Sequence, residues 1–326
     1  MKKNRNLVLV LVLMSILLLG FQNCSQARFS STDVSKNTSL NGIVYNKSLT
    51  FSVIESKNAR ADILFVIDNS GSMAEEQAKI AQVFSGFIAQ VSNMDWRIAI
   101  TTTDTDSSDT PCNEGNLCLM EPNRSFIDSS TPNVNQVFMN KIQVGTQGSS
   151  TELGLTAISS FLTNKKADYQ AFMRPDATFV TIVVTDSEET SSLTAVQFLE
   201  NVKAQLPQGK KYINHSSIVL PGDSACRAIN SAEDKYAFKY HDVTVATGGI
   251  SASICDANYG SQFKLIADTT IGKVAQQILD CAASDVLVTG PSGEIISGYG
   301  ISGNKINFSP ALENPGDYKI SYTCAP

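Results

Sequence analysis

The sequence is poor in the residues on which most catalytic and nucleic-acid-binding proteins depend. Its 326 residues include only two histidines, His215 and His241, and its net charge is −6. Nucleic-acid binding requires a concentration of Lys and Arg, and no such patch occurs here. The sequence also lacks G-x-S-x-G, H-E-x-x-H and a phosphate-binding Gly-rich loop. We therefore expect neither an enzyme nor a nucleic-acid-binding protein, and two isolated histidines in structural or exposed positions.

No apolar run is long enough to span a membrane as a helix. The longest, Leu7–Phe21, has about 15 residues and follows Lys2, Lys3 and Arg5, whereas a spanning helix needs ~20. A basic segment followed by a short apolar run is typical of a secretory signal, and this one ends at Cys24, where a lipoprotein signal carries its acylated cysteine. The residues before Cys24 are larger than usual there, and the alternative is an ordinary cleaved signal peptide. We expect a bacterial-type lipoprotein of the cell envelope, held at the outer membrane or cell surface by its lipid anchor.

The sequence has no C-x-x-C motif, so a zinc site is not expected. Besides Cys24 it contains six cysteines, an even number that indicates disulfides in an exported protein. Cys112 and Cys118 flank a short loop and can close on each other. Cys226 with Cys255 and Cys281 with Cys324 are the preferred remaining pairs, although sequence alone leaves the pairing open.

Apolar strand patterns alternate with helix patterns through the middle of the chain. Ile63–Ile67 is an unbroken apolar run, and further strands are expected over 96–103, 178–185, 213–220 and 250–254. Helices are expected from residue 74 to 91 and over 151–162, 196–206 and about 270–282. Unbroken apolar strands are buried on both faces, as in a parallel sheet. The predicted fold is therefore α/β, a doubly wound, mostly parallel, Rossmann-like sheet.

The two ends of the chain have a different pattern of apolar and polar residues. Leu49–Glu55 alternates strictly between apolar and polar residues, and short alternating strands recur over 286–288, 306–308 and 318–324. Neither set can bury a core by itself, so we expect both to meet in one small antiparallel β module with the α/β domain inserted between them. The predicted segments are a signal peptide at 1–24, a tether at 25–48, a strand at 49–57, the α/β domain at 58–283 and the module at 284–326.

Oxygen-bearing side chains follow the ends of two buried strands. The first strand runs into Asp68-x-Ser70-x-Ser72, the segment GSSTELGL places Thr151 before a later helix, and a further strand ends at Asp186. This order resembles the von Willebrand factor A family with its metal-ion-dependent adhesion site, over roughly residues 61–282. The resemblance implies that these five residues hold a divalent cation to which a partner protein adds an acidic side chain.

The chemistry of these residues is consistent with that implication. Two neighbouring carboxylates repel each other unless a cation lies between them, and carboxylate and hydroxyl oxygens suit Mg²⁺, Mn²⁺ or Ca²⁺. We expect Mg²⁺ first. Ser150 is a competing ligand to Thr151, which could instead cap a helix. The cluster could also be a polar turn without metal, or a metal site that only stabilises an envelope scaffold protein.

Further acidic residues lie near the predicted site. Ser187, Glu188 and Glu189 replace the Gly that often follows the family's acid, and these extra carboxylates could hold the metal more tightly and close its open position. Asp104, Asp106 and Asp109 miss the spacing of a calcium-binding loop. We interpret those three as a solvated acidic loop.

Overall fold

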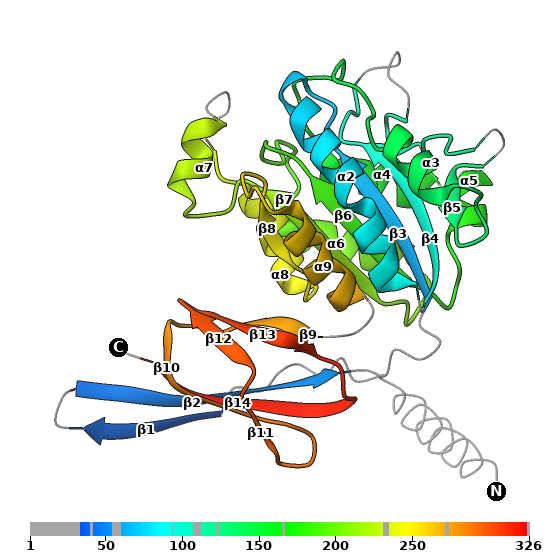
Figure 1. Cartoon of the computed structure of the whole chain (residues 1–326). Coiled ribbons are helices and arrows are strands. Elements are labelled where there is room, and N and C mark those ends of the chain that lie inside the picture. Colours follow the sequence, from blue (N-terminus) through cyan, green and yellow to red (C-terminus); the bar gives the residue numbers. More distant parts are fainter. Residues whose placement is uncertain are drawn as a thin grey trace, which may run out of the picture. The chain divides into compact units, whose positions relative to one another are not determined.

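The structure is a computed structural model that describes residues 33–39, 42–53, 60–92, 94–106, 112–121, 124–164, 167–230, 235–270 and 274–324. All of them belong to one compact unit, Thr32–Pro326. Within it, residues 60–270 form an α/β domain, and residues 33–53 and 274–324 form a β module (Figure 1). The proposed signal peptide and Cys24 lie outside the described residues.

The α/β domain is built on a six-stranded sheet with the order β5-β4-β3-β6-β7-β8. The strands are β3 (Arg60–Ile67), β4 (Asp95–Thr102), β5 (Phe126–Asp128), β6 (Thr178–Val184), β7 (Tyr212–Ile218) and β8 (Ser251–Ser253). Neighbouring strands are parallel except for the β4–β5 pair. The expected α/β class and mostly parallel sheet are confirmed.

Helices cover both faces of the sheet. They are η1 (Gly71–Met73), α2 (Ala74–Val91), α3 (Val134–Lys141), α4 (Gly154–Asn164), α5 (Ala167–Phe172), α6 (Ala195–Gln205), α7 (Ser224–Ile229), α8 (Phe238–Ala246) and α9 (Tyr259–Thr270). Phe65 of β3 packs in one core with α2, α3 and α9, whereas Leu64 and Val66 pack in a second core with α4, α6 and α8 (Figure 1). Because successive residues of a strand point to opposite faces, burial on both sides explains the unbroken apolar run.

The β module contains two antiparallel sheets. The larger has the order β1-β2-β14-β10-β11 and the smaller β12-β13-β9. Their strands are β1 (Asp33–Ser39), β2 (Gly42–Val53), β9 (Val274–Ile278), β10 (Ala283–Thr289), β11 (Ile295–Ile296), β12 (Tyr299–Ser302), β13 (Lys305–Leu312) and β14 (Gly316–Cys324).

The two ends of the chain meet in this module. β2 pairs with β14 from Val53 opposite Gly316 to Tyr45 opposite Cys324, and the Phe51 and Tyr318 rings stack with their centroids 5.6 Å apart. Val53 and Phe308 belong to the same apolar core. The pairing expected from the alternating sequences is confirmed, and the α/β domain lies between β2 and β9 along the chain.

Two segments differ from the sequence expectation. Part of the predicted tether forms β1 and the start of β2, which pair antiparallel with Ser39 opposite Gly42. The hydrogen bonds between strands join backbone groups, so a polar composition does not exclude strands here. The last helix of the α/β domain is Tyr259–Thr270, not 270–282. Val274 and Ile278 have helical spacing, but they lie in β9, which pairs with β13.

All six cysteines of the described chain form disulfides. Cys112 pairs with Cys118 in the loop after β4, Cys226 of α7 pairs with Cys255 after β8, and Cys281 pairs with Cys324 at the end of β14. The three preferred pairs are confirmed. No helix in the described ranges is long and apolar enough to cross a membrane.

Candidate metal centre

The loop after β3 buries one carboxylate at the carboxyl end of the sheet. Asp68 is 0% exposed, and its backbone N–H donates to the Val184 carbonyl of β6 over 3.0 Å. Its Oδ1 accepts the Ser70 N–H at 2.8 Å. The Ser70 and Ser72 hydroxyl oxygens lie 3.2 Å apart, and Ser72 is exposed. The motif thus presents one buried carboxylate and two hydroxyls on one turn.

The loop after β6 brings Asp186 close to Asp68. The residue before Asp186, Thr185, donates its hydroxyl to Asp68 Oδ2 at 2.6 Å, and Asp186 is half-buried. Burial raises the pKa of Asp68 to about 6, the hydrogen bonds from Thr185 and Ser70 oppose that rise, and the negative charge of Asp186 adds to it. The order of strands reverses between β3 and β6, and such a switch point is where doubly wound sheets bind ligands.

Glu152 is a buried acid that the sequence interpretation did not select. It is 1% exposed, and its Oε2 accepts a hydrogen bond from the Thr103 hydroxyl, while Oε1 has no hydrogen-bond partner. Burial, followed by the charge of Asp68, raises the pKa of Glu152 to about 9; a hydrogen bond between the Glu152 and Asp68 side chains and the charge of Asp104 contribute further. Glu152 and Asp68 therefore form one pair of facing carboxyl groups.

Asp104 corrects the expectation of a solvated acidic loop after β4. Asp104 is 0% exposed; its Oδ1 accepts the Asp106 N–H at 2.9 Å and its Oδ2 the Ser149 N–H at 3.4 Å. Asp106 is exposed, as expected, and Asp109 lies outside the described residues. A sequence signal was present, because β4 is parallel to β3 and its carboxyl end must reach the same edge.

Thr151 lies at the surface, directly before the buried acid Glu152. Its side chain is exposed, and its backbone N–H donates to Ser149 Oγ at 3.0 Å. Two backbone bonds fix this loop: Gly148 N–H donates to the Asn69 carbonyl and Leu153 N–H to that of Thr103. A Cβ on Gly148 would lie 2.4 Å from the Asn69 side chain, so this close approach requires glycine. The residue that reaches Asp68 from this loop is Glu152.

The acidic residues after Asp186 stabilise helices. Glu189 accepts the Leu155 N–H at 2.8 Å and the Thr156 hydroxyl at 2.9 Å, at the start of α4. Glu188 accepts the Lys239 N–H at 3.2 Å, at the start of α8. Carboxylates are favourable at helix N-termini, where N–H groups lack partners. These contacts account for both glutamates without a metal.

The donor set fits a hard divalent cation. Within the described part of the chain, no ion pair involves Asp68, Glu152 or Asp186. Buried oxygen atoms without partners occur here on Glu152 and on the neighbouring Asn69. Oxygen donors of this kind are suited to Mg²⁺, Mn²⁺ or Ca²⁺. Among the described residues, the one set of three His, Cys, Asp or Glu ligand atoms that all lie within 4.8 Å of one another is Asp280 with Cys281 and Cys324, and its two cysteines form a disulfide. Asp68, Glu152 and Asp186 do not form so close a set.

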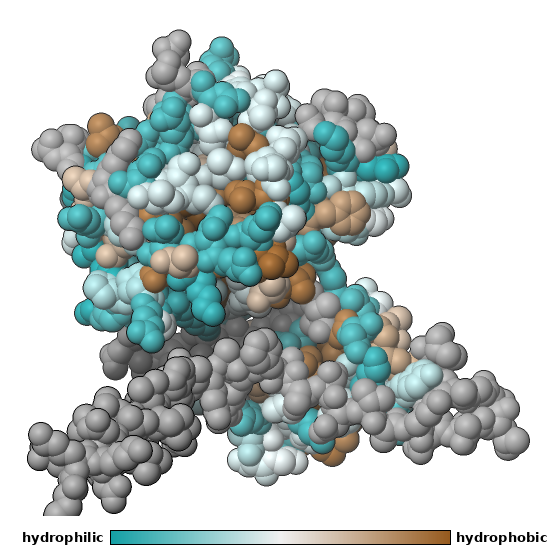
Figure 2. Space-filling model, turned by 180° about the vertical axis from the view of Figure 1, so that it is seen from behind, coloured by the Kyte–Doolittle hydropathy of each residue, from teal (hydrophilic) through white to brown (hydrophobic). Residues whose placement is uncertain are grey.

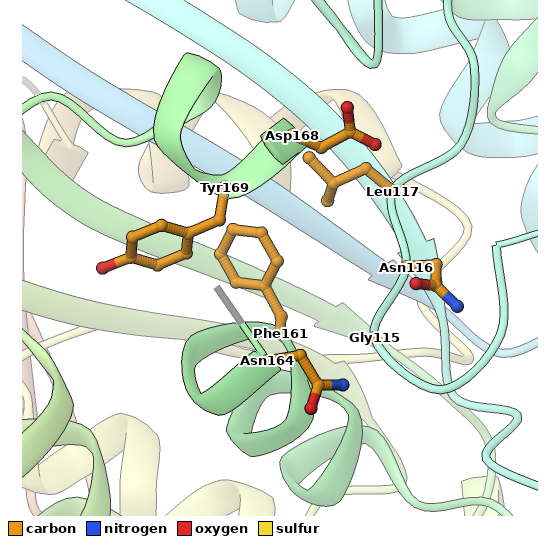
Figure 3. Close-up of a pocket in the computed structure, with 7 residues that line it drawn as sticks. All are labelled: Gly115, Asn116, Leu117, Phe161, Asn164, Asp168 and Tyr169. Carbon is orange, nitrogen blue, oxygen red and sulfur yellow. The ribbon is translucent and has the colours of Figure 1, made fainter. Parts of the chain in front are cut away.

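The pocket drawn in Figure 3 lies away from these acids. It is lined by Leu117 of the disulfide loop, Phe161 of α4 and Tyr169 of α5, among others (Figure 3). Its volume of about 20 Å³ is room for roughly one water molecule. On the face of the molecule seen in Figure 2, apolar side chains are interspersed with polar ones. Neither feature offers an alternative site for a sizeable ligand.

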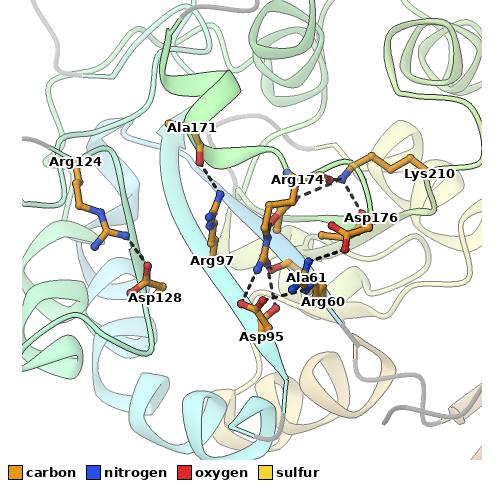
Figure 4. A network of polar contacts seen from close by, with 12 residues as sticks. Arg60, Ala61, Asp95, Arg97, Arg124, Asp128, Ala171, Arg174, Asp176 and Lys210 are labelled. Atoms are coloured by element: carbon orange, nitrogen blue, oxygen red, sulfur yellow. Dashed lines mark hydrogen bonds and ion pairs between the residues drawn. The ribbon is translucent and has the colours of Figure 1, made fainter. Parts of the chain in front are cut away.

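The amino end of the same sheet carries acids that are neutralised within the chain. Asp62 is 0% exposed and accepts Arg174 Nε and backbone N–H, each at 2.7 Å. Lys210 lies 3.4 Å from it. Arg174 also pairs with Asp95, and Arg60 pairs with Asp176 (Figure 4). At this end the chain supplies its own cations.

No known protein family and no curated protein matches the sequence. Solved structures resemble it weakly. The pilus adhesin SpaC of Lactobacillus rhamnosus GG has 11% identity and a TM-score of 0.35, over 90% of this chain and 42% of that one. Two crystal structures of proximal thread matrix protein 1 from the mussel byssus have 12% and 13% identity and TM-scores of 0.41 and 0.39, over 71% and 68% of this chain and 52% and 49% of those. The chain spans about half the length of these proteins, and similarity at this level carries no argument about function.

Proposed function

We propose that the chain is a cell-envelope lipoprotein whose α/β domain is of the von Willebrand factor A type and binds a protein partner through a divalent metal, Mg²⁺ in the first instance. The partner supplies an acidic side chain to the metal. The observation that carries the proposal is the position of Asp68 and Asp186, which follow β3 and β6 at the switch point of the sheet. Ser70 and Ser72 add neutral oxygens on the same turn.

Charge supports the proposal as much as position does. Asp68 is buried beside Glu152 and within the field of Asp186, and these three acids have no Lys or Arg ion-pair partner in the described ranges. Buried charges in proteins are paired or coordinate metals. A bound divalent cation supplies the missing positive charge, and its open coordination position gives a partner's carboxylate a place to bind.

Metal binding is tested directly by calorimetry on the full-length chain. We expect Mg²⁺ and Mn²⁺ to bind with one-site behaviour. Partner capture from envelope extract should then require Mg²⁺, be lost in EDTA, return on adding Mg²⁺ back, and be absent for Asp68→Ala. Equal capture in EDTA would contradict adhesion through the metal.

The second candidate is a metal that only stabilises an envelope scaffold protein. The observation in its favour is burial, since Asp68 and Glu152 are 0% and 1% exposed. The two functions differ in what chelation does. If EDTA lowers the melting temperature but leaves partner affinity unchanged, the metal is structural; if partner affinity falls as well, it is adhesive.

The lipid anchor is a separate part of the proposal. It rests on the sequence before Cys24, outside the described residues. Mass spectrometry of the mature protein should find an acylated N-terminal Cys24, and Cys24→Ser should move the protein to the soluble fraction. An unmodified N-terminus at another residue would disprove the anchor without affecting the metal site.

A further inference from the structure

The second loop of the candidate site offers the metal a different residue from the one expected. Thr151 has an exposed side chain, whereas the next residue, Glu152, is 1% exposed and directed at Asp68. The direction is fixed by the chain, because Leu153 N–H is bonded to the Thr103 carbonyl and the Thr103 hydroxyl is bonded to Glu152 Oε2. Thr103 thus bonds both to the Glu152 side chain and to the backbone of the next residue.

Its second oxygen has no hydrogen-bond partner. Glu152 Oε1 is buried and unsatisfied, and the negative charges of Asp68 and Asp104 act on this side chain. A buried polar atom left without a partner costs about 1–3 kcal/mol, and more when the group is charged. Two carboxyl groups that face each other in the interior are therefore unfavourable for the stability of the fold when nothing else binds between them. The same arrangement becomes favourable when a cation joins the two.

We propose that Glu152, and not Thr151, is the metal ligand contributed by the second loop, so that the facing carboxylates of Asp68 and Glu152 hold the cation. This inference rests on the proposed metal site and concerns which residues form it. With Asp186 nearby, the acids carry more negative charge than a divalent ion neutralises, which disfavours a further acidic side chain from a partner at the metal's open position. Glu152 is then an internal competitor of the partner.

The experiment compares two neighbouring substitutions, Glu152→Gln and Thr151→Val, in the full-length chain. Glu152→Gln keeps the size of the side chain and removes its charge, and Thr151→Val removes only the hydroxyl. Mn²⁺ affinity is measured by calorimetry. We expect Glu152→Gln to weaken binding at least about tenfold, the lower end of the range for outer-shell partners of metal ligands, and Thr151→Val to change it less than twofold.

A melting curve in EDTA separates lost affinity from lost folding. Glu152→Gln should melt at or above the wild-type temperature in EDTA, because it removes one of two facing carboxyl groups, and should lose the rise in melting temperature that Mn²⁺ gives the wild type. A lower melting temperature in EDTA would make Glu152 a structural residue and overturn the inference.

The inference and the proposed function fail in different ways. Should Thr151→Val and Asp68→Asn lose Mn²⁺ binding while Glu152→Gln retains it, the metal site stands and the assignment of Glu152 is wrong. Should the wild type bind no divalent cation, both are wrong.

Discussion

The two ends of the central sheet treat buried acids in opposite ways. At the amino end, Asp62 forms ion pairs with Arg174 and Lys210 of the same chain. At the carboxyl end, Asp68 faces Glu152 and is affected by the negative charge of Asp186. Its hydrogen-bond donors are the Thr185 hydroxyl and the Ser70 N–H. The amino end contains its own cations, whereas in our proposal a cation from outside completes the carboxyl end. The comparison shows how a candidate binding site can be recognised by charge that the fold leaves uncompensated.

Removing the buried aspartate at the amino end should have the largest effect. Asp62→Ala leaves the guanidinium of Arg174 and the ammonium of Lys210 without their shared carboxylate. Breaking a buried ion pair costs about 3–5 kcal/mol, and we expect that loss in the free energy of unfolding measured with urea in EDTA. The matched variant at the other end, Asp68→Ala, should lose no stability in EDTA, because it relieves repulsion. Equal losses at both ends would contradict the comparison.

Asp68→Ala and Asp186→Ala should weaken metal binding instead of lowering the stability of the fold. Loss of an outer-shell partner already costs about 10–100-fold in metal affinity, so we expect each variant to bind Mg²⁺ or Mn²⁺ at least roughly a hundredfold more weakly. Calorimetry measures this directly, and Asp62→Ala is the control that should bind metal as the wild type does once folded. Unchanged affinity in either variant would remove that residue from the site.

A third way to bury an ionisable group is to keep it neutral, and His215 of β7 is the example. It is fully buried; its Nδ1 accepts the Ile250 N–H at 3.0 Å, and burial lowers its pKa to about 3. Below about pH 6.5 His215 becomes protonated in the unfolded chain, whereas in the folded chain it stays neutral. Stability therefore falls with falling pH between about 6.5 and 3, by about 1.4 kcal/mol per pH unit. Between pH 7 and 5, urea unfolding in EDTA should show a smaller loss of unfolding free energy for His215→Asn than for the wild type. Identical losses would show that His215 is not the source of this pH dependence.

Glu189→Gln should cause the smallest of these losses in the free energy of unfolding, and it separates a helix-stabilising glutamate from the proposed metal ligand Glu152. Both glutamates are buried at the same end of the sheet, but Glu189 accepts bonds from Leu155 and Thr156 at the start of α4. We expect Glu189→Gln to lower stability by about 1 kcal/mol with metal affinity unchanged, the reverse of Glu152→Gln. Thermal melts and Mn²⁺ calorimetry on the two variants check this, and a loss of metal affinity in Glu189→Gln would place it in the site.

The elements of the fold that follow from short-range patterns were predictable from the sequence. The unbroken run Ile63–Ile67 predicts a strand buried on both faces, and the alternation in Leu49–Glu55 predicts one buried on a single face. Parallel strands bring their carboxyl ends to one edge, so Asp68 and Asp186 could be placed together before any coordinates. The pairing of β2 with β14 followed from the lack of any other partner for either end.

Side-chain direction within the loops was not predictable in the same way. Thr151 and Glu152 are adjacent, and which of them is buried beside Asp68 depends on the bonds from Gly148 and Leu153 to distant residues. Glu188 and Glu189 stabilise α8 and α4, whose starting points become neighbours of β6 only in the folded chain. For β9, helical spacing of apolar residues in a short segment was outweighed by pairing with β13.

The pairing of β2 with β14 has a mechanical consequence. A domain that follows its neighbour in sequence is joined by one segment, whereas the inserted α/β domain leaves the module after β2 and returns to it at β9. Tension on the α/β domain is therefore shared by two covalent connections. β2 runs antiparallel to β14 over a register that extends from Val53 to Tyr45, and the last residue of β14 is covalently tied to Cys281. For an anchored adhesin of the kind proposed, a pull along β2 loads these backbone hydrogen bonds together in shear, so the module resists extension as a unit.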